Sequence, residues 1–189
     1  MNNTIFNMQP AKISDVTEIH KLVNRFADMG EMLPRSMSEL YENIRDFVVV
    51  KDEDNKLAGC ASLHVVWEDL AEVKAVAVTE DWQSKGLGAY LVTTRIEEAK
   101  ELGLATIFCL THKPAFYEKL GFSQVDVMTL PRKVWGECMR CPKFPACNEI
   151  ALVVHLTPEG AASLKSPQSV NSGAWEVPVM SSFNRPPML

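Results

Sequence analysis

The sequence has no long hydrophobic run and no large cluster of positive charge. No stretch approaches the roughly 18 continuous apolar residues that a membrane-spanning helix needs. Residues 1–4 lack the basic segment and the apolar run of a signal peptide. The formal net charge at pH 7 is −5, which disfavours nucleic acid and membrane surfaces as partners. We therefore expect a cytoplasmic protein.

The cysteines are too few and too unevenly placed for a secreted disulfide framework. Of the five cysteines, Cys60 and Cys109 lie in apolar, strand-like runs, whereas Cys138, Cys141 and Cys147 share one polar loop. A structural zinc site needs four ligands, and this loop supplies only three cysteines. We expect no bound metal and keep the loop as a zinc candidate. A thiol cluster or a clamp beside the substrate is the alternative.

The hydrophobic pattern predicts one mixed α/β domain over residues 1–156. We expect strands at residues 4–8, 47–51, 57–66, 73–78, 106–110 and 151–156, and helices at residues 14–29, 40–44, 86–103 and 115–120. The second and third strands, joined by a polar turn, are typical of a hairpin. Ser36 and Glu39 fit a capping box that opens the second helix.

A different composition begins after this domain. Residues 157–189 carry five prolines among serine and asparagine, with little apolar periodicity. Such a segment buries too little apolar surface to offset the entropy of ordering. We therefore expect a C-terminal tail that is disordered when it stands alone.

The segment DWQSKGLGAYLV, residues 81–92, joins a glycine-bearing turn to an amphipathic helix. It lacks the Walker A and dinucleotide-binding patterns. Instead, Gln83, Gly86 and Gly88 follow a strand that ends at Val78. Glycines here let backbone N–H groups converge on an anion at the helix N-terminus, which suits a pyrophosphate without a metal. The alternative is that the glycines only shape the turn.

The same segment resembles the Q/R-x-x-G-x-G/A loop of the GNAT acetyltransferase superfamily. An acidic-led strand before it and the sequence AFYEKLGF after it support the resemblance, which covers roughly residues 5–156. It implies a central mixed, mostly antiparallel sheet, splayed at the acyl-CoA site and flanked by helices. It also implies acetyl-CoA as co-substrate. The pyrophosphate would lie against Gln83, Ser84, Lys85, Gly86, Leu87 and Gly88, and the pantetheine would bond to Val76, Ala77 and Val78.

Further segments narrow the resemblance. Residues 33–50, 59–63 and 71–78 resemble the acetyltransferase domain of the N-acetylglutamate synthases, the first enzymes of arginine biosynthesis. Residues 130–152 resemble the short, kinase-less form of these enzymes. The resemblance implies acetyl transfer to the α-amine of L-glutamate. Because the amino-acid-kinase domain of the long forms is missing from this sequence, we expect no arginine feedback through such a domain.

The resemblance also implies roles in catalysis. Acetyl transfer needs a neutral amine, and Glu72 is the expected base; the alternative is a strand-end carboxylate that only pairs with Lys74. The backbone N–H of Val76, on a bulged strand, would stabilise the oxyanion. Tyr117 or Thr111 would protonate the coenzyme A thiolate. Their structural alternatives are a core aromatic for Tyr117 and a helix cap for Thr111.

A dicarboxylic amino acid requires cations on two sides of its pocket. Arg35 matches the position at which the synthases bind a substrate carboxylate. Arg132 or Lys133 would hold the side-chain carboxylate, with help from Lys74. For each of these residues a solvated surface position is the alternative.

Two rival functions stay open. In the first, the same fold acetylates another amino acid, a small amine or a protein N-terminus; Arg35 and Arg132 argue against a protein acceptor. In the second, the protein is a non-catalytic acyl-CoA sensor whose cysteine loop and tail bind a partner. The oligomeric state is also open, with a homodimer among the alternatives.

Overall fold

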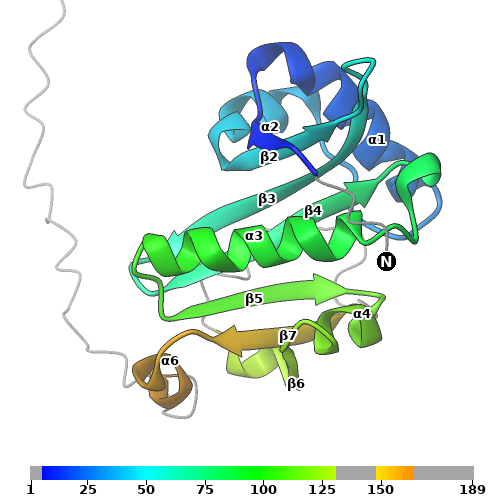
Figure 1. The fold of residues 1–189 in the computed structure, drawn as a ribbon. Helices are drawn as coiled ribbons and strands as arrows, with labels where there is room; N and C mark the ends of the chain where they lie inside the picture. Colours follow the sequence, from blue (N-terminus) through cyan, green and yellow to red (C-terminus); the bar gives the residue numbers. More distant parts are fainter. Residues whose placement is uncertain (1–5, 131–147, 164–189) are drawn as a thin grey trace, which may run out of the picture.

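The fold is a single mixed sheet with helices on both faces. The computed structural model describes residues 6–130 and 148–163, and within them seven strands are ordered β1-β2-β3-β4-β5-β7-β6. The pair β4 and β5 is parallel, and the other neighbours are antiparallel, as Figure 1 shows. The strands are β1 Met8–Pro10, β2 Phe47–Lys51, β3 Leu57–Trp67, β4 Leu70–Val78, β5 Thr106–Thr111, β6 Ser123–Val125 and β7 Ile150–His155.

Along the chain, most helices connect one strand to the next. The α-helices are α1 Val16–Asp28, α2 Met37–Glu42, α3 Leu87–Glu101, α4 Pro114–Glu118 and α6 Pro158–Ser163. Short 3-10 turns are η1 Ile13–Asp15, η2 Ile44–Asp46, η3 Glu80–Trp82 and η4 Val127–Thr129. In the described part of the chain, no helix is both long enough and apolar enough to cross a membrane.

The predicted fold class is confirmed, and so are the β2–β3 hairpin and the capping box of α2. The Ser36 hydroxyl accepts a hydrogen bond from the Glu39 N–H at 3.2 Å, and the Ser36 N–H donates to the Glu39 carboxylate at 2.8 Å. Phe47–Lys51 forms a strand with the predicted bounds. These elements are determined by residues close together in the sequence, so local patterns were enough to predict them.

Other predicted boundaries were wrong. The first strand, expected at residues 4–8, is Met8–Pro10, and residues 6 and 7 are not part of it, because its register is set by pairing with β2. Residues 4 and 5 lie outside the described residues. The first helix starts at Val16 after a 3-10 turn, and the Asp15 carboxylate bonds the Lys12 N–H, so Ser14 is not its cap. Strand β6 was missed, because three residues carry too little pattern.

The region expected as a disordered tail begins with helix α6. A Cβ at Gly160 would lie 2.3 Å from the backbone oxygen of Ala105. Glycine therefore lets this short helix approach the start of β5 closely. The rest of the tail lies outside the described residues.

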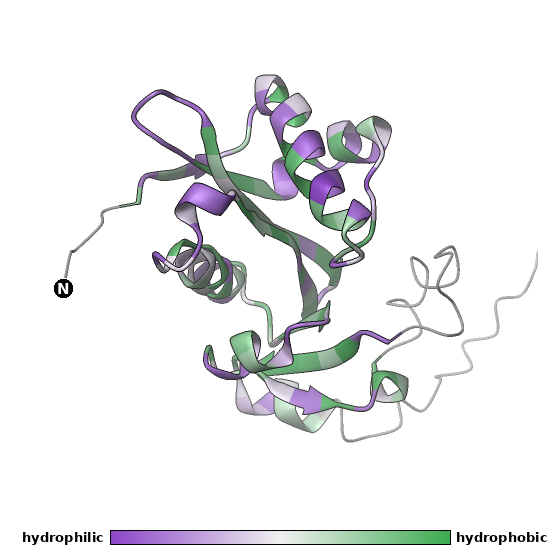
Figure 2. Cartoon of the chain, turned by 90° about the vertical axis from the view of Figure 1, so that its right-hand side faces the viewer, coloured by the Kyte–Doolittle hydropathy of each residue, from purple (hydrophilic) through white to green (hydrophobic). Residues whose placement is uncertain are grey.

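Strand β2 shows how the sheet separates two apolar layers. Its side chains alternate between the faces: Phe47 and Val49 pack against α1 and α2, whereas Val48 and Val50 pack against α3. In Figure 2, α3 lies on one side of the strands and α1 and α2 lie on the other, with hydrophobic residues concentrated along the strands. The strand therefore reads as continuously apolar, because both of its faces are buried.

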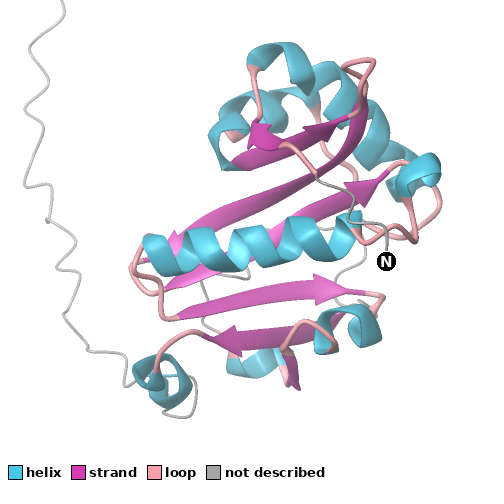
Figure 3. Ribbon diagram, viewed as in Figure 1, coloured by secondary structure: helices cyan, strands magenta, loops and turns pink. Residues whose placement is uncertain are grey.

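The sheet opens between β4 and β5. These strands pair only from Leu70 to Glu72 on β4, and Figure 1 shows them diverging toward their carboxyl ends. Figure 3 shows α3 running along this part of the sheet, where Val92 and Ile96 pack with residues of both strands. The splay expected at the acyl-CoA site is therefore present.

A buried ion pair ties the start of α1 to the sheet. The Asp15 carboxylate, 3% exposed, accepts hydrogen bonds from Lys51 Nζ at 2.6 Å and from the Lys12 N–H at 2.8 Å. Burial acts to raise the pKa of Asp15, but these two hydrogen bonds outweigh it and hold the pKa below its usual value. The folded state therefore favours the ionised carboxylate.

We expect Asp15→Asn to lower the free energy of unfolding by about 2 kcal/mol at pH 7, measured by urea denaturation. Because the folded pKa is lowered, the contribution of the carboxylate is present above its unfolded pKa, about 3.9, and is lost as the pH falls through the folded pKa. Asp54→Asn is the matched control, because Asp54 forms an exposed ion pair with Lys56; its cost should stay within about 0.5 kcal/mol. Equal costs for both variants would contradict the assignment.

Candidate active site

A cavity of about 500 Å³ lies where β4 and β5 separate. Its walls come from the segment after α1, from β4, from the glycine turn with the start of α3, and from the end of β5 with α4. Residues from the predicted site that line it are Arg35, Lys74, Val76, Ala77, Val78, Gln83, Ser84, Gly86, Gly88, Thr111 and Tyr117. The fold therefore brings together residues that lie more than 80 positions apart in the sequence.

Strand β4 forms one wall of the cavity and carries a bulge. Ala75 and Val76 together lie opposite one residue of β3, and Ala75 has a φ of 52°. The Cys60 thiol donates to the Ala75 carbonyl at 3.6 Å. Burial raises the pKa of Cys60 to about 12, so it remains a thiol. The bulge that was expected next to Val76 is therefore present, and from Val73 to Val78 the described part of β5 does not pair with β4.

The glycine turn forms a second wall. Ser84 and Gly86 have positive φ values of 58° and 87°, and Gly86 is the N-cap of the 15-residue helix α3. No described side chain caps this helix end, so its first backbone N–H groups are available to a ligand. The Gln83 side-chain amide donates to the Val78 carbonyl at 3.1 Å, which fixes the turn against the end of β4.

Two residues of the predicted pyrophosphate loop do not line the cavity. The Lys85 ammonium lies over the Trp82 ring, 5.1 Å from its centroid. Leu87 is fully buried and packs with β2 and β3. Their side chains therefore pack against the protein, away from the cavity lining.

The predicted base, Glu72, pairs with a cation of the cavity wall. Its carboxylate lies 3.5 Å from Lys74 Nζ, and the two side chains are 15% and 12% exposed. The pairing foreseen as the alternative is thus present, although the pair is largely buried. Lys74 lines the cavity, whereas Glu72 is not among its lining residues.

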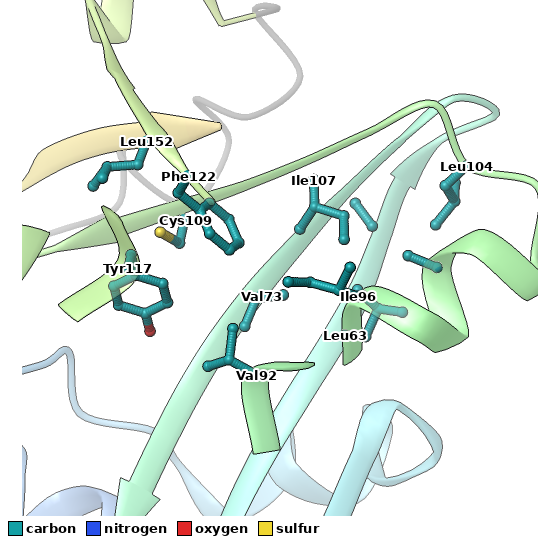
Figure 4. Packing of buried hydrophobic residues seen from close by; sticks show 12 residues of the cluster. Leu63, Val73, Val92, Ile96, Leu104, Ile107, Cys109, Tyr117, Phe122 and Leu152 are labelled. Atoms are coloured by element: carbon teal, nitrogen blue, oxygen red, sulfur yellow. The ribbon is translucent and has the colours of Figure 1, made fainter. Parts of the chain in front are cut away.

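Tyr117 belongs both to the core and to the cavity wall. Its ring packs edge-on against Phe116 and Phe122, with centroids 5.0 and 5.4 Å away. Figure 4 shows its hydroxyl pointing away from Phe122 and Leu152. Burial raises the pKa of Tyr117, and the nearby Cys109 and Glu72 raise it further. The phenol therefore keeps its proton and can donate a hydrogen bond into the site.

Thr111 is the last residue of β5 and lines the cavity. Its hydroxyl oxygen accepts a hydrogen bond from the Lys113 N–H at 3.0 Å. This is a turn contact and not the helix cap foreseen as the alternative, because the N-cap of α4 is Lys113. The hydroxyl proton is not used in that contact, so Thr111 can still donate to a group in the cavity.

Arg35 is positioned by its own backbone. The Asn24 side chain donates to the Arg35 carbonyl at 2.8 Å and accepts from its N–H at 3.1 Å. The guanidinium lies 3.9 Å from the Glu39 carboxylate and lines the cavity. Because Asn24 on helix α1 fixes the Arg35 backbone, the side chain of Arg35 extends from a fixed position at the edge of the cavity.

Part of the predicted site lies outside the described residues. This applies to two predicted substrate-binding cations and to the zinc candidates, namely Arg132, Lys133, Cys138, Cys141 and Cys147. Among residues 6–130 and 148–163, no group of three histidine, cysteine, aspartate or glutamate side chains is placed to hold a metal.

Three charged residues line the cavity that the sequence had not identified. They are Glu31, Lys113 and Glu149. Lys113 Nζ and Glu31 are 2.6 Å apart and join the segment after α1 to the end of β5. All three lie next to element ends, where no periodic pattern marks them, so only the tertiary structure identifies them.

Residues 15–122 match the Acetyltransferase (GNAT) family. An uncharacterized N-acetyltransferase of Chlorobaculum tepidum is 34% identical over 143 residues, which are 76% of this chain and 92% of that relative. An amino-acid acetyltransferase of Mycobacterium tuberculosis is 33% identical over 132 residues, 69% of this chain and 75% of that relative.

Solved structures show the same fold. One is Rv2747 of Mycobacterium tuberculosis in complex with CoA and NLQ, with a TM-score of 0.70, 26% identity, and coverage of 80% of this chain and 99% of that one. Another is N-acetylglutamate synthase of Neisseria gonorrhoeae with coenzyme A and N-acetyl-glutamate. Its TM-score is 0.75 at 23% identity, and the match covers 82% of this chain and 36% of that one.

We expect the phenol of Tyr117 to remain protonated through the range around pH 10 in which tyrosine ordinarily ionises, because burial raises its pKa. Ultraviolet titration of the folded protein checks this. The native protein and Tyr117→Phe should show the same ionisation amplitude up to the pH at which the fold is lost. A smaller amplitude in Tyr117→Phe near pH 10 would show that the phenol is free to ionise.

Proposed function

This chain belongs to the acetyltransferase (GNAT) family, and we propose that it transfers the acetyl group of acetyl-CoA to the α-amino group of L-glutamate. The observation that carries the proposal is one cavity that combines the N-terminus of α3 with Arg35 and Lys74. The names of two relatives, amino-acid acetyltransferases of Mycobacterium tuberculosis and Vibrio cholerae, support an amino-acid acceptor.

The wall of the cavity suits an acyl-CoA in two ways. The N-terminus of α3 offers backbone N–H groups and a partial positive charge to a pyrophosphate. Along β4, backbone groups beyond Glu72 face the cavity instead of β5, so a pantetheine can bond to Val76, Ala77 and Val78. A Cβ at Gly88 would lie 3.5 Å from the Phe116 ring, which is an ordinary contact distance, so glycine here leaves the space of one methyl group open to a ligand.

The bulge at Ala75 supports our assignment of catalysis to the middle of β4. A bulge redirects one backbone amide out of the ladder, and the Val76 N–H is the donor that we assign to the thioester oxygen. Tyr117 and Thr111 face the cavity from the other side of the splay. Because a thiol has an ordinary pKa near 8.5 and the pKa of Tyr117 is raised, Tyr117 stabilises the departing sulfur mainly by hydrogen bonding.

The acceptor carboxylates would meet the cations of the cavity. The Arg35 guanidinium can bind one carboxylate bidentately, and Lys74 Nζ lies on the facing strand β4. We assign the binding of the side-chain carboxylate to Arg132 or Lys133, with help from Lys74. This arrangement favours a dicarboxylic amino acid over lysine, because the cations repel its second ammonium group. It also disfavours a peptide N-terminus, because that residue has no free α-carboxylate for the cations to bind.

We expect Gly86→Ala to weaken acetyl-CoA binding about tenfold, measured by calorimetry. A left-handed alanine costs about 1 kcal/mol, and the turn can release this strain by moving away from the ligand. Gly103→Ala is the matched control: its φ is 78°, and, as at Gly86, no atom lies within 4 Å of the added methyl group. Both variants should lose similar stability, and only Gly86→Ala should lose affinity. An equal dissociation constant for both would remove the turn from the binding site.

The acceptor is tested by measuring thiol release from acetyl-CoA with a panel of amines. We expect turnover with L-glutamate and none with lysine or peptides. Turnover that favours another amine would refute the glutamate assignment, and silence with every amine while acetyl-CoA binds would favour the sensor.

A pair of arginine variants serves as the control for the acceptor test. Arg35→Ala should raise the KM for glutamate at least tenfold and leave acetyl-CoA binding unchanged, because it removes a carboxylate contact. Arg45→Ala, at an exposed arginine outside the cavity, should change neither. An unchanged KM in Arg35→Ala would exclude the proposed contact.

A further inference from the structure

Glu149 brings a second carboxylate to the reaction site. It directly precedes β7, and Ile150, the next residue, pairs with Thr111 at the end of β5. Its side chain is 11% exposed and lines the cavity together with Thr111, Lys113 and Tyr117. A largely buried carboxylate therefore reaches the cavity from the strand next to β5, across the splay from β4.

Contacts on the β5 side locate this carboxylate. The Glu149 oxygen lies 3.9 Å from His112 Nε2, a buried nitrogen that has no hydrogen-bond partner in the described residues. Burial raises the pKa of Cys109, and the charges of Glu72 and Glu149 raise it further. The charges of both carboxylates therefore act on the same core thiol, Glu72 from β4 and Glu149 from the residue before β7.

The two carboxylates differ in their access to an acceptor. Glu72 lies 3.5 Å from the ammonium group of Lys74 and is absent from the cavity lining. Glu149 belongs to that lining. An incoming amine is protonated at neutral pH, so it needs an anion at the wall that can hold its charge and then take its proton.

We propose that Glu149, rather than Glu72, binds the ammonium group of the acceptor and accepts its proton. The assignment rests on the proposed function only in that the acceptor is an amine. Glu149 takes one proton from the ammonium, and this proton passes to solvent. The neutral nitrogen then attacks the acetyl carbon, the new C–N bond forms and the C–S bond breaks. A second proton leaves the nitrogen and reaches the sulfur, directly or across the Tyr117 hydroxyl, which gives the amide and the free thiol.

Several charged or titratable groups face this position and influence its pH dependence. They come from β4, from β5 and from the start of α4, and they are Glu72, Lys74, Cys109, His112, Lys113 and Tyr117. A change in the pH profile is therefore assigned to Glu149 only by comparing variants that leave these groups in place.

The test compares pH–rate profiles of the native protein, Glu149→Gln, Glu149→Asp and Glu72→Gln, with the amine that the native protein acetylates best. We expect Glu149→Gln to lower kcat/KM about 100-fold near pH 7. Its remaining rate should rise about tenfold per pH unit up to the pKa of the acceptor, because only the already neutral amine then reacts. Glu149→Asp should keep the native shape of the profile at a reduced rate. Glu72→Gln should also keep the native shape of the pH–rate profile.

Two controls separate this role from damage to the fold. Glu149→Gln should bind acetyl-CoA with native affinity, and Glu97→Gln, an exposed carboxylate on α3, should match the native protein throughout. The proposal is overturned if Glu149→Gln stays within threefold of the native rate, or if its rate falls equally at every pH. It is also overturned if Glu72→Gln alone acquires the steep profile.

A failure of the Glu149 assignment can be told apart from a failure of the glutamate assignment. If the native protein prefers an amine other than glutamate, the glutamate assignment fails, and the role of Glu149 is decided with that amine. If the native protein acetylates no amine at all, both assignments fail together.

Discussion

The site depends on one interruption in the sheet, the end of the β4–β5 pairing after Glu72. Beyond that point the bulge at Ala75 bends β4, and backbone groups that would bond to β5 face the cavity. Backbone groups in a protein interior need partners, and from Val73 onward β5 does not supply them, which is why we assign this edge to an extended ligand. The same separation exposes the N-terminus of α3 to the cavity. An unpaired strand edge and a helix N-terminus therefore meet in one cavity because of a single change in pairing.

The charges of the cavity suit a zwitterion better than a simple anion. Arg35, Lys74 and Lys113 supply positive charge, whereas Glu31 and Glu149 supply negative charge. In a cavity of low dielectric constant, these charges act more strongly on a ligand than they would in water. A ligand with both signs can place each of its charges near groups of the opposite sign, whereas a dicarboxylate without an amine would only add negative charge beside Glu31 and Glu149. Selection of an amino acid thus depends on both kinds of group being present.

The sequence predicted the parts of the fold that follow from local chemistry. The capping box at Ser36 and the apolar strand β2 are encoded within a few neighbouring residues, and the turn at Gly86 is marked by its glycines. The register of β1 and the existence of β6 depend on partners far along the chain, so local patterns could not define them. Glu149 was missed for a related reason: it lies in a loop, and only the pairing of β7 with β5 brings it to the cavity.

Two ion pairs near the cavity differ in strength: one lies within its N-terminal side and the other joins its two sides. On the N-terminal side, the buried Asp15 carboxylate fixes the start of α1 to β2. Across the cavity, Lys113 and Glu31 form an ion pair whose side chains are 63% and 36% exposed. Exposed pairs contribute at most about 1 kcal/mol, so this pair opposes separation of the two sides only weakly. The two sides are therefore joined mainly by the β4–β5 pairing and by the core cluster that α3 shares with both strands, and only slightly by this ion pair.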